Sequence, residues 1–255
     1  MKINHISVSR KQCYELCPMQ YRFRYHNEIK SPEPEPEYFL YGKIMHKCAQ
    51  EYVEHRGKMM LDEIAHDILK GRIPLDTDRE GNKKVAQPLS LEYRKRMPDE
   101  LKSLQDLFDK VGTDGQTEYN FSFDLNPPNQ CLIVGFIDWF FKVGDQYFIV
   151  DYKTTKIGKW RENEWGIVNN LQLRAYARVV QKNFGVKAEN ITAALYYLQG
   201  GDLVSAQFDH KSLVEAERDL LATYREIKDA DPDKVRAHPG EHCRRCDYRS
   251  ICQFK

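Results

Sequence analysis

The stretch FIVDYKTT, residues 148–155, is an apolar run that ends in an acid, an aromatic residue and a base. Side chains alternate between the two faces of a β-strand, so Asp151 and Lys153 share one face and Tyr152 takes the other. Folding alone does not require a carboxylate and an ammonium to project together from the end of a buried strand. We therefore expect a functional site where this strand ends.

A third ionisable residue stands on the preceding apolar run. Asp138 lies in CLIVGFIDWFFKV, residues 131–143, which a Gly-Asp pair typical of a hairpin joins to the strand of Asp151. Two carboxylates on neighbouring strands suit Mg²⁺ or Mn²⁺, and such a metal with Lys153 beside it suits phosphodiester hydrolysis. Alternatively, both aspartates cap strands and Lys153 forms an ordinary surface ion pair.

Periodicity along the chain predicts both helices and strands. Helical spacing of apolar residues indicates helices over about 9–26, 41–56, 100–111, 165–185 and 211–230, and strand patterns cover 118–125, 131–143, 145–154 and 190–198. The order of these elements predicts the α/β (α+β) class, with a central mixed β-sheet flanked by helices. We expect one domain over residues 1–255, with a helical insertion at 57–112.

Charge and hydropathy restrict the location and partners of the protein. The chain has 39 Lys and Arg against 38 Asp and Glu, a net charge of +1, which counts against a strongly basic nucleic-acid binder. Residues 1–30 and 83–96 are locally basic and could face phosphates or simply be solvated. No apolar run is long enough to span a bilayer and no signal-like segment opens the chain, so we expect a cytoplasmic protein without a membrane partner.

Three of the seven cysteines cluster near the C-terminus. Cys243, Cys246 and Cys252 have the spacing C-x2-C-x5-C, which is typical of a metal site. A fourth ligand is needed, and Cys13 and Cys17 near the N-terminus both qualify. Four thiolates suit zinc or an iron–sulfur cluster equally well.

Several of these motifs together resemble a known family. Asp138 followed by D-Y-K (151–153) resembles the PD-(D/E)xK nuclease superfamily, although Ile137 replaces the leading Pro of its motif. The segments YGKIMHKCAQ, LQLRAYA and SVSRKQCYELCPMQYRFRY resemble its RecB-like exonuclease branch, which includes the CRISPR-associated exonucleases. The resemblance is collinear over residues 7–252 and implies a restriction-endonuclease-like core.

The resemblance also implies roles for individual residues. It implies Mg²⁺ or Mn²⁺ ligands at His46, Asp138, Asp151 and the backbone carbonyl of Tyr152, with Glu118 where the family often has an acid. It implies that Lys153 assists the attacking water. Gln172 and Tyr176, four residues apart on one helix face, would shape the site. On periodicity alone, Glu118 could point at the site or into solvent.

For the cysteines, the resemblance implies a [4Fe–4S] cluster. The family's fourth ligand is the Cys before Pro, which is Cys17 here, and Cys13 is the fallback. The cluster would join residues 1–30 to residues 240–255 and would be architectural rather than catalytic. Structural Zn²⁺ is the alternative cofactor.

The expected function is cleavage of DNA. The resemblance implies an exonuclease on DNA ends, preferring single strands, in recombination, repair or replication, acting alone or with a helicase because the chain lacks a P-loop motif. The aromatic-basic run YRFRYHNEIK (21–30), with Arg10, Arg22 and Arg24, would either bind the strand or pack its rings inward. Two alternatives are a non-catalytic nucleic-acid-binding subunit and a CRISPR adaptation nuclease that works with an integrase.

Overall fold

A mixed six-stranded sheet forms the centre of the computed structural model, which describes residues 1–77, 80–125, 131–158 and 161–254. Its strands are β1 (His5–Ile6), β4 (Gln116–Asp124), β5 (Leu132–Val143), β6 (Gln146–Lys153), β7 (Ile191–Tyr197) and β8 (Asp202–Gln207). The order is β1-β5-β6-β7-β8, and β4 pairs with β5. The β1–β5 and β6–β7 pairs are parallel and the others antiparallel, so the predicted mixed sheet is confirmed.

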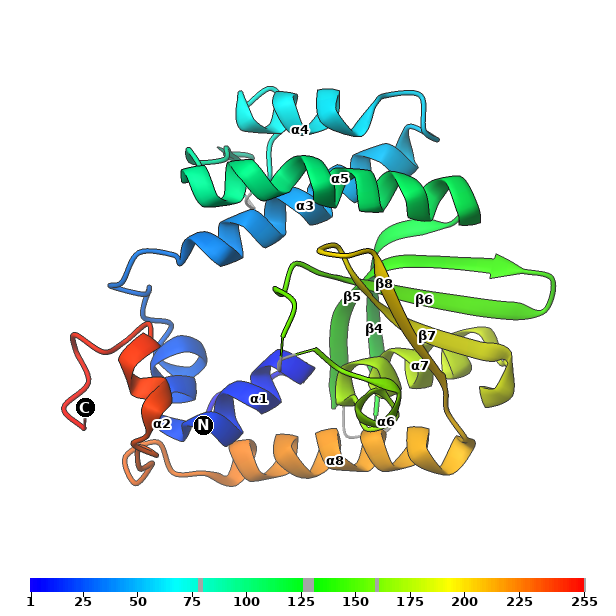
Figure 1. Cartoon of the computed structure of the whole chain (residues 1–255). Coiled ribbons are helices and arrows are strands. Elements are labelled where there is room, and N and C mark those ends of the chain that lie inside the picture. Colours follow the sequence, from blue (N-terminus) through cyan, green and yellow to red (C-terminus); the bar gives the residue numbers. More distant parts are fainter. Residues whose placement is uncertain (78–79, 126–130, 159–160, 255) are drawn as a thin grey trace.

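Helices cover the sheet on two sides (Figure 1). They are α1 (Val8–Leu16), α2 (Pro18–Tyr21), a π-helical turn (Arg22–His26), α3 (Glu37–Glu54), α4 (Leu61–Leu69), α5 (Leu91–Val111), α6 (Glu164–Ile167), α7 (Leu171–Phe184) and α8 (His210–Asp229). Short 3₁₀ turns lie at Ala188–Asn190 and Glu241–Arg245, and β2 (Asp76–Thr77) pairs with β3 (Lys83–Lys84). None of the described helices has the length and apolar content needed to cross a bilayer.

Two apolar cores result from this layering. One contains α1, α7 and α8 packed on the sheet, and the other contains α3, α4 and α5. Burial of the apolar faces of these helices is what stabilises them, since isolated helices of this length are marginal in water. Residues 57–112, expected as an insertion, hold α4, α5 and the β2–β3 pair. The assignment of the whole chain to one domain stays a prediction.

Strand β5 reverses its faces at Asp138. Ile137 packs in the core of α7 and α8, whereas Trp139 packs in the core of α3 and α5. In a regular strand, residues two apart would point to the same face. The reversal places Asp138 between the two cores.

Two predicted helices are each divided in the structure. The helix expected over 9–26 is broken at Cys17, which is extended with φ −161° and ψ 107°. Pro18 explains the break, because it disfavours helical backbone in the residue before it and then opens α2. The helix expected over 165–185 is α6 and α7, because the Asn170 side chain accepts a hydrogen bond from the backbone of Leu173 and starts a new helix.

Other boundaries also differ from the sequence-based expectation. The helix expected at 100–111 begins earlier, at Leu91, and contains Pro98. Pro98 is the eighth residue of α5, so the helix continues past a position that lacks the N–H for a bond to the Arg94 carbonyl. Helix α4 was not predicted, although its apolar residues recur at helical spacing.

Gly115 fixes the approach of β4 to β5. At φ +117°, a Cβ on Gly115 would lie 2.5 Å from the Phe140 carbonyl oxygen and 2.6 Å from Phe141 Cβ. Gly115→Ala should lower the free energy of unfolding by more than about 2 kcal/mol, measured by urea denaturation. Gly144→Ala is the control, since Gly144 has φ +58° and no atom within 4 Å, and should cost only about 1 kcal/mol. Equal losses would contradict the close approach.

Candidate metal centre

The site begins where β5 and β6 stop pairing. Their ladder runs from Val143 and Gln146 at the hairpin to Trp139 and Val150. Beyond that point the Tyr152 N–H faces β5 without a ladder partner, and a buried N–H needs an acceptor. The Asp138 carboxylate fills this position, since Tyr152 N donates to Asp138 Oδ2 at 2.8 Å.

His46 of α3 closes the site from the other side. Its Nε2 donates to the Tyr152 carbonyl at 3.0 Å, and its Nδ1 lies 3.4 Å from Asp138 Oδ2. Burial alone would lower the pKa of His46, but the Asp138 carboxylate outweighs burial and raises the pKa to about 9. The metal-free protein therefore holds a positive imidazolium among these oxygens at neutral pH.

Glu118 of β4 joins this group through an unusual backbone. Its φ of 47° lies in the left-handed region, which costs a non-glycine residue about 1–2 kcal/mol. One ligand atom each from Glu118, His46 and Asp138 lies within 4.8 Å of the others. Burial, and then the Asp138 charge, raises the pKa of Glu118. The structure thus places Glu118 at the site rather than in solvent.

Asp151 and Lys153 form a buried ion pair at the end of β6. Lys153 Nζ lies 2.5 Å from Asp151 Oδ2, and Asp151 is only 2% exposed. The pair is close in distance, yet no described donor meets hydrogen-bond geometry at Asp151 Oδ2. Burial and the nearby Asp138 charge raise the pKa of Asp151 to about 6. The Lys153 ammonium is thus the cation that faces this carboxylate oxygen in the metal-free protein.

A hydrogen-bonded chain links Lys153 to α7. Lys153 Nζ donates to Gln172 Oε1 at 3.3 Å, and Gln172 Nε2 donates to the Tyr176 hydroxyl at 2.9 Å. The Phe121 ring meets the Tyr176 ring edge-on, with centroids 5.6 Å apart. The structure therefore brings Gln172 and Tyr176 to the lysine, and no direct contact joins them to the carboxylates.

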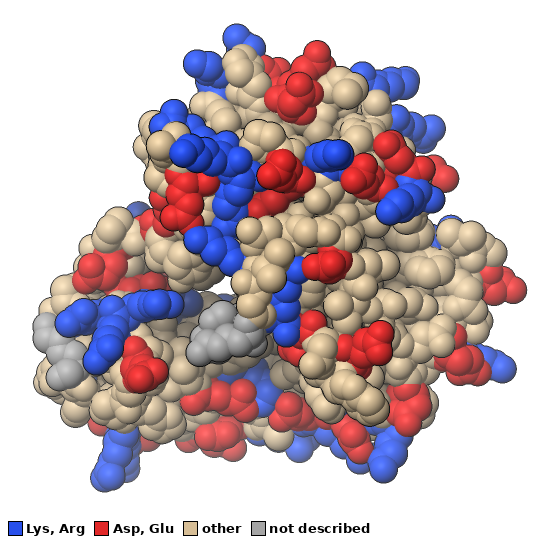
Figure 2. Space-filling view, in the orientation of Figure 1, with Lys and Arg blue, Asp and Glu red and all other residues tan. Residues whose placement is uncertain are grey.

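A cavity of about 910 Å³ opens over the centre. His46, Glu118, Asp138 and Lys153 line it, while Asp151 does not. Several further lining residues were not predicted from the sequence, namely Tyr38, Phe39, Lys43, Lys47 and Phe136. The lysines could have been found, because they stand three residues before and one residue after His46 on the same helix. Figure 2 shows an opening in this face with Lys and Arg side chains along its edge.

The aromatic rings of the N-terminal run pack inward. Tyr21 is fully buried, Tyr25 lies 5.0 Å from it, and Phe23 contacts Tyr248 with centroids 5.4 Å apart. The Arg10 guanidinium lies over the Tyr25 ring at 4.7 Å. These contacts favour the packing interpretation of this run over base stacking.

The two arginines of that run pair with acids. Arg22 lies 3.2 Å from Asp233, and Arg24 forms an ion pair with Asp247. Neither these arginines nor Arg10 line the cavity over the centre. Their predicted contact with nucleic acid therefore stays a prediction, and the lysines that do line the cavity are Lys43, Lys47 and Lys153.

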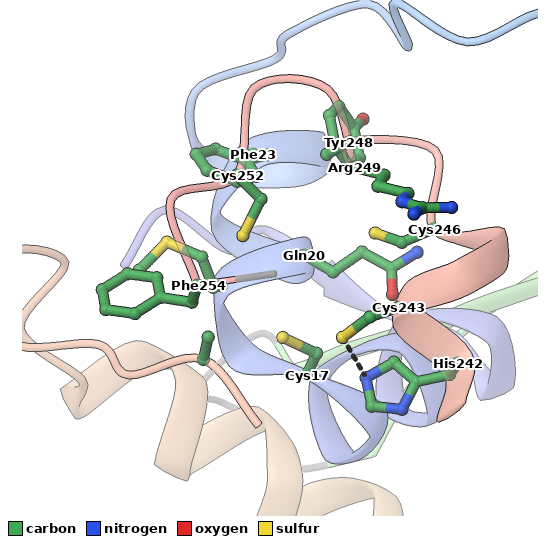
Figure 3. A pocket seen from close by; sticks show the side chains of 12 residues that line it. Cys17, Gln20, Phe23, His242, Cys243, Cys246, Tyr248, Arg249, Cys252 and Phe254 are labelled. Atoms are coloured by element: carbon green, nitrogen blue, oxygen red, sulfur yellow. Dashed lines mark hydrogen bonds between the residues drawn. The ribbon is translucent and has the colours of Figure 1, made fainter. Parts of the chain in front are cut away.

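Four cysteines from the two ends of the chain line a second pocket (Figure 3). They are Cys17, Cys243, Cys246 and Cys252, whereas Cys13 is buried in the neighbouring core. Among the described residues, no three of these thiols lie within 4.8 Å of one another. A single zinc with Zn–S bonds of about 2.3 Å would hold its sulfurs about 3.8 Å apart. The thiols share a pocket but are not spaced for one zinc ion.

Comparison with known proteins identifies the family. The model of the PD-(D/E)XK nuclease superfamily matches residues 5–253. The chain belongs to this superfamily. No curated protein sequence matches it at a significant level.

Two solved structures resemble this nuclease fold. A protein from Eubacterium rectale named "Putative exonuclease" is 15% identical, with a TM-score of 0.57 over 99% of this chain and 90% of that chain. The protein SSO0001 is 12% identical, with a TM-score of 0.46 over 100% of this chain and 89% of that chain. At these identities the first likeness supports the fold, and the second carries no argument.

The donor set of the centre can be tested without DNA. Mn²⁺ should raise the melting temperature of the wild-type protein, because a ligand that binds only the folded state stabilises it by mass action. His46→Ala should remove most of that shift, and Glu118→Gln should reduce it. His55→Ala serves as the control, since His55 caps the same helix at its exposed end. Thermal melts across an Mn²⁺ titration measure the effect, and equal shifts in all four proteins would contradict the assignment.

Proposed function

We propose that this protein is a metal-dependent DNA nuclease that hydrolyses phosphodiester bonds at DNA ends, with a preference for single strands. The observation that carries the proposal is the convergence of His46, Asp138 and Glu118 beside the Asp151–Lys153 pair at the point where β5 and β6 separate. Membership of the nuclease superfamily supports the reaction class. The name of the Eubacterium rectale protein agrees with action on ends.

The donors fit Mg²⁺ or Mn²⁺. Carboxylate oxygens of Asp138 and Asp151, the Tyr152 carbonyl and the His46 ring would hold the ion, with Glu118 as a further ligand. Binding would displace the His46 proton that now occupies the centre, so the metal would take over its positive charge. When bound, such a metal polarises a phosphoryl oxygen and lowers the pKa of a water molecule.

Lys153 acts as a cation in this proposal. Burial alone would lower the pKa of Lys153, but the Asp151 carboxylate outweighs burial and raises it. The ammonium therefore stays protonated at neutral pH and can neutralise charge that develops on the phosphate. Gln172 and Tyr176 hold the ammonium in place through the chain of hydrogen bonds from α7.

We further propose that the four cysteines hold a [4Fe–4S] cluster. They line one pocket, and their wider spacing suits a cluster whose iron and sulfide ions lie between the thiolates. The cluster would tie the start of α2 to the C-terminal segment. The pathway, any helicase or integrase partner and the cytoplasmic location stay predictions.

The nuclease proposal predicts a loss of cleavage in Lys153→Ala. The protein is incubated with end-labelled linear and closed circular single-stranded DNA in Mg²⁺, Mn²⁺ or EDTA. Wild type should degrade only the linear strand and only with metal. The variant should be slower by about 10²-fold or more, since a cation at the reacting phosphate is lost.

Lys142→Ala is the matched control for this test. Lys142 lies on the same hairpin, over the Tyr147 ring and outside the cavity, so its removal should leave the rate unchanged. Absence of cleavage by wild type in every metal would favour a nucleic-acid-binding subunit instead. Cleavage of the circular strand would contradict action on ends.

The cluster proposal predicts that Cys17→Ser loses iron. Protein purified without oxygen should contain about four iron atoms and four acid-labile sulfides per chain and absorb visible light. Cys17→Ser should lose most of this content because one of the four ligands is missing. Cys48→Ser is the control, since Cys48 is fully buried between α3 and α5. Zinc without sulfide in the wild-type protein would replace the cluster with a structural zinc site.

A further inference from the structure

Exposed aromatic rings gather at the catalytic cavity. Of the large apolar side chains exposed among the described residues, six are aromatic, and three of these line this cavity: Tyr38, Phe39 and Phe136. Single exposed apolar residues are ordinary, but three rings around one metal centre are a concentration that solvation disfavours. Such rings suit a ligand that offers flat apolar faces.

Phe136 stands between the metal centre and a second cavity. It is 53% exposed and lies two residues before Asp138 on β5, on the side that faces the cleft. It lines both the catalytic cavity and a neighbouring cavity of about 350 Å³. A group stacked on Phe136 would therefore lie directly beside the reacting phosphate.

The second cavity has the walls of a site for a flat heteroaromatic ring. Phe121 and Gly135 supply an apolar floor, and Ser9 and Gln12 of α1 and Gln172 of α7 supply polar groups at its sides. The Phe121 ring packs so closely on Gly135 that a Cβ at position 135 would lie 2.6 Å from it. An apolar floor with a few polar side groups is the usual composition of a small-molecule site.

Tyr38 and Phe39 line the catalytic cavity from another element, α3. They occupy the first turn of α3, each is 51% exposed, and their ring centroids are 4.6 Å apart. Lys43 and Lys47 follow on the same helix, on either side of His46, and line the same cavity. Exposed rings and lysines that line one cavity suit the bases and phosphates of a single strand.

We propose that the cleft binds an unpaired strand by stacking, with one base on Phe136 and seated in the second cavity, and with further bases on Tyr38 and Phe39. This inference rests on the proposed nuclease function and names its substrate as a strand whose bases are free at the cleavage point. Paired bases in a duplex must first be unpaired and unstacked before one can enter a side cavity, which costs free energy that an unpaired strand does not spend. Phe136 thus sets strand specificity as well as the position of the phosphate.

The test separates base stacking from phosphate contact. Fluorescence anisotropy measures the binding of two labelled strands, dT12 and a 12-mer without bases, in the presence of Mn²⁺. The Lys153→Ala protein is used so that the strand stays intact. Both strands have equal charge. Adding Phe136→Ala should weaken dT12 binding roughly tenfold and leave binding of the base-free strand unchanged, because only a base can stack. Phe136→Trp should retain tight binding of dT12.

Trp165→Ala is the control variant in the same background. Trp165 is 85% exposed and lines neither cavity, so its loss should not change either affinity. Equal affinity of the Phe136→Ala and parent proteins for dT12, or equal weakening toward both strands, would overturn the stacking proposal. Cleavage by wild type is assayed alongside, so a failure of the nuclease proposal is recognised separately from a failure of stacking.

Discussion

The organisation of the site depends on one buried N–H group. Tyr152 belongs to β6, and its N–H faces a strand that has already turned away. Tyr152 is only 3% exposed, so its N–H needs an acceptor from the protein. The Asp138 side chain supplies the acceptor that the backbone of β5 no longer offers. The hydrogen bond that completes the sheet therefore also fixes the carboxylate that faces the cleft.

The separation of β5 from β6 also explains why charged side chains gather at the metal centre. Where β5 and β6 separate, backbone groups and acidic side chains line the space between the two strands in place of apolar side chains. Asp138, Asp151 and Glu118 would repel one another, and burial increases the cost. The His46 imidazolium and the Lys153 ammonium offset that repulsion in the metal-free protein. The centre is thus electrostatically prepared for a cation before one binds.

Sequence patterns predicted the parts that depend on local chemistry. The D-Y-K spacing, the hairpin and the cysteine spacing are short-range features, so they located β5, β6, the acids and the thiols of one pocket. Local patterns did not predict the reversal of β5 at Asp138 or the left-handed backbone of Glu118, because both arise from packing between two cores. The exposure of Phe136 was not predicted either, because the sequence alone does not tell an exposed ring in an apolar strand from a buried one.

The long sequence separations within the site have a consequence for biosynthesis. His46 meets Tyr152 across 106 residues, and α1 packs against α8 at the other end of the chain. Contacts of this range form slowly and only after both segments have left the ribosome. While the chain is being made, the acids of β5 and β6 emerge before α7 brings Gln172 to the lysine. The site of a nascent chain is therefore incomplete until nearly all of the chain has been synthesised.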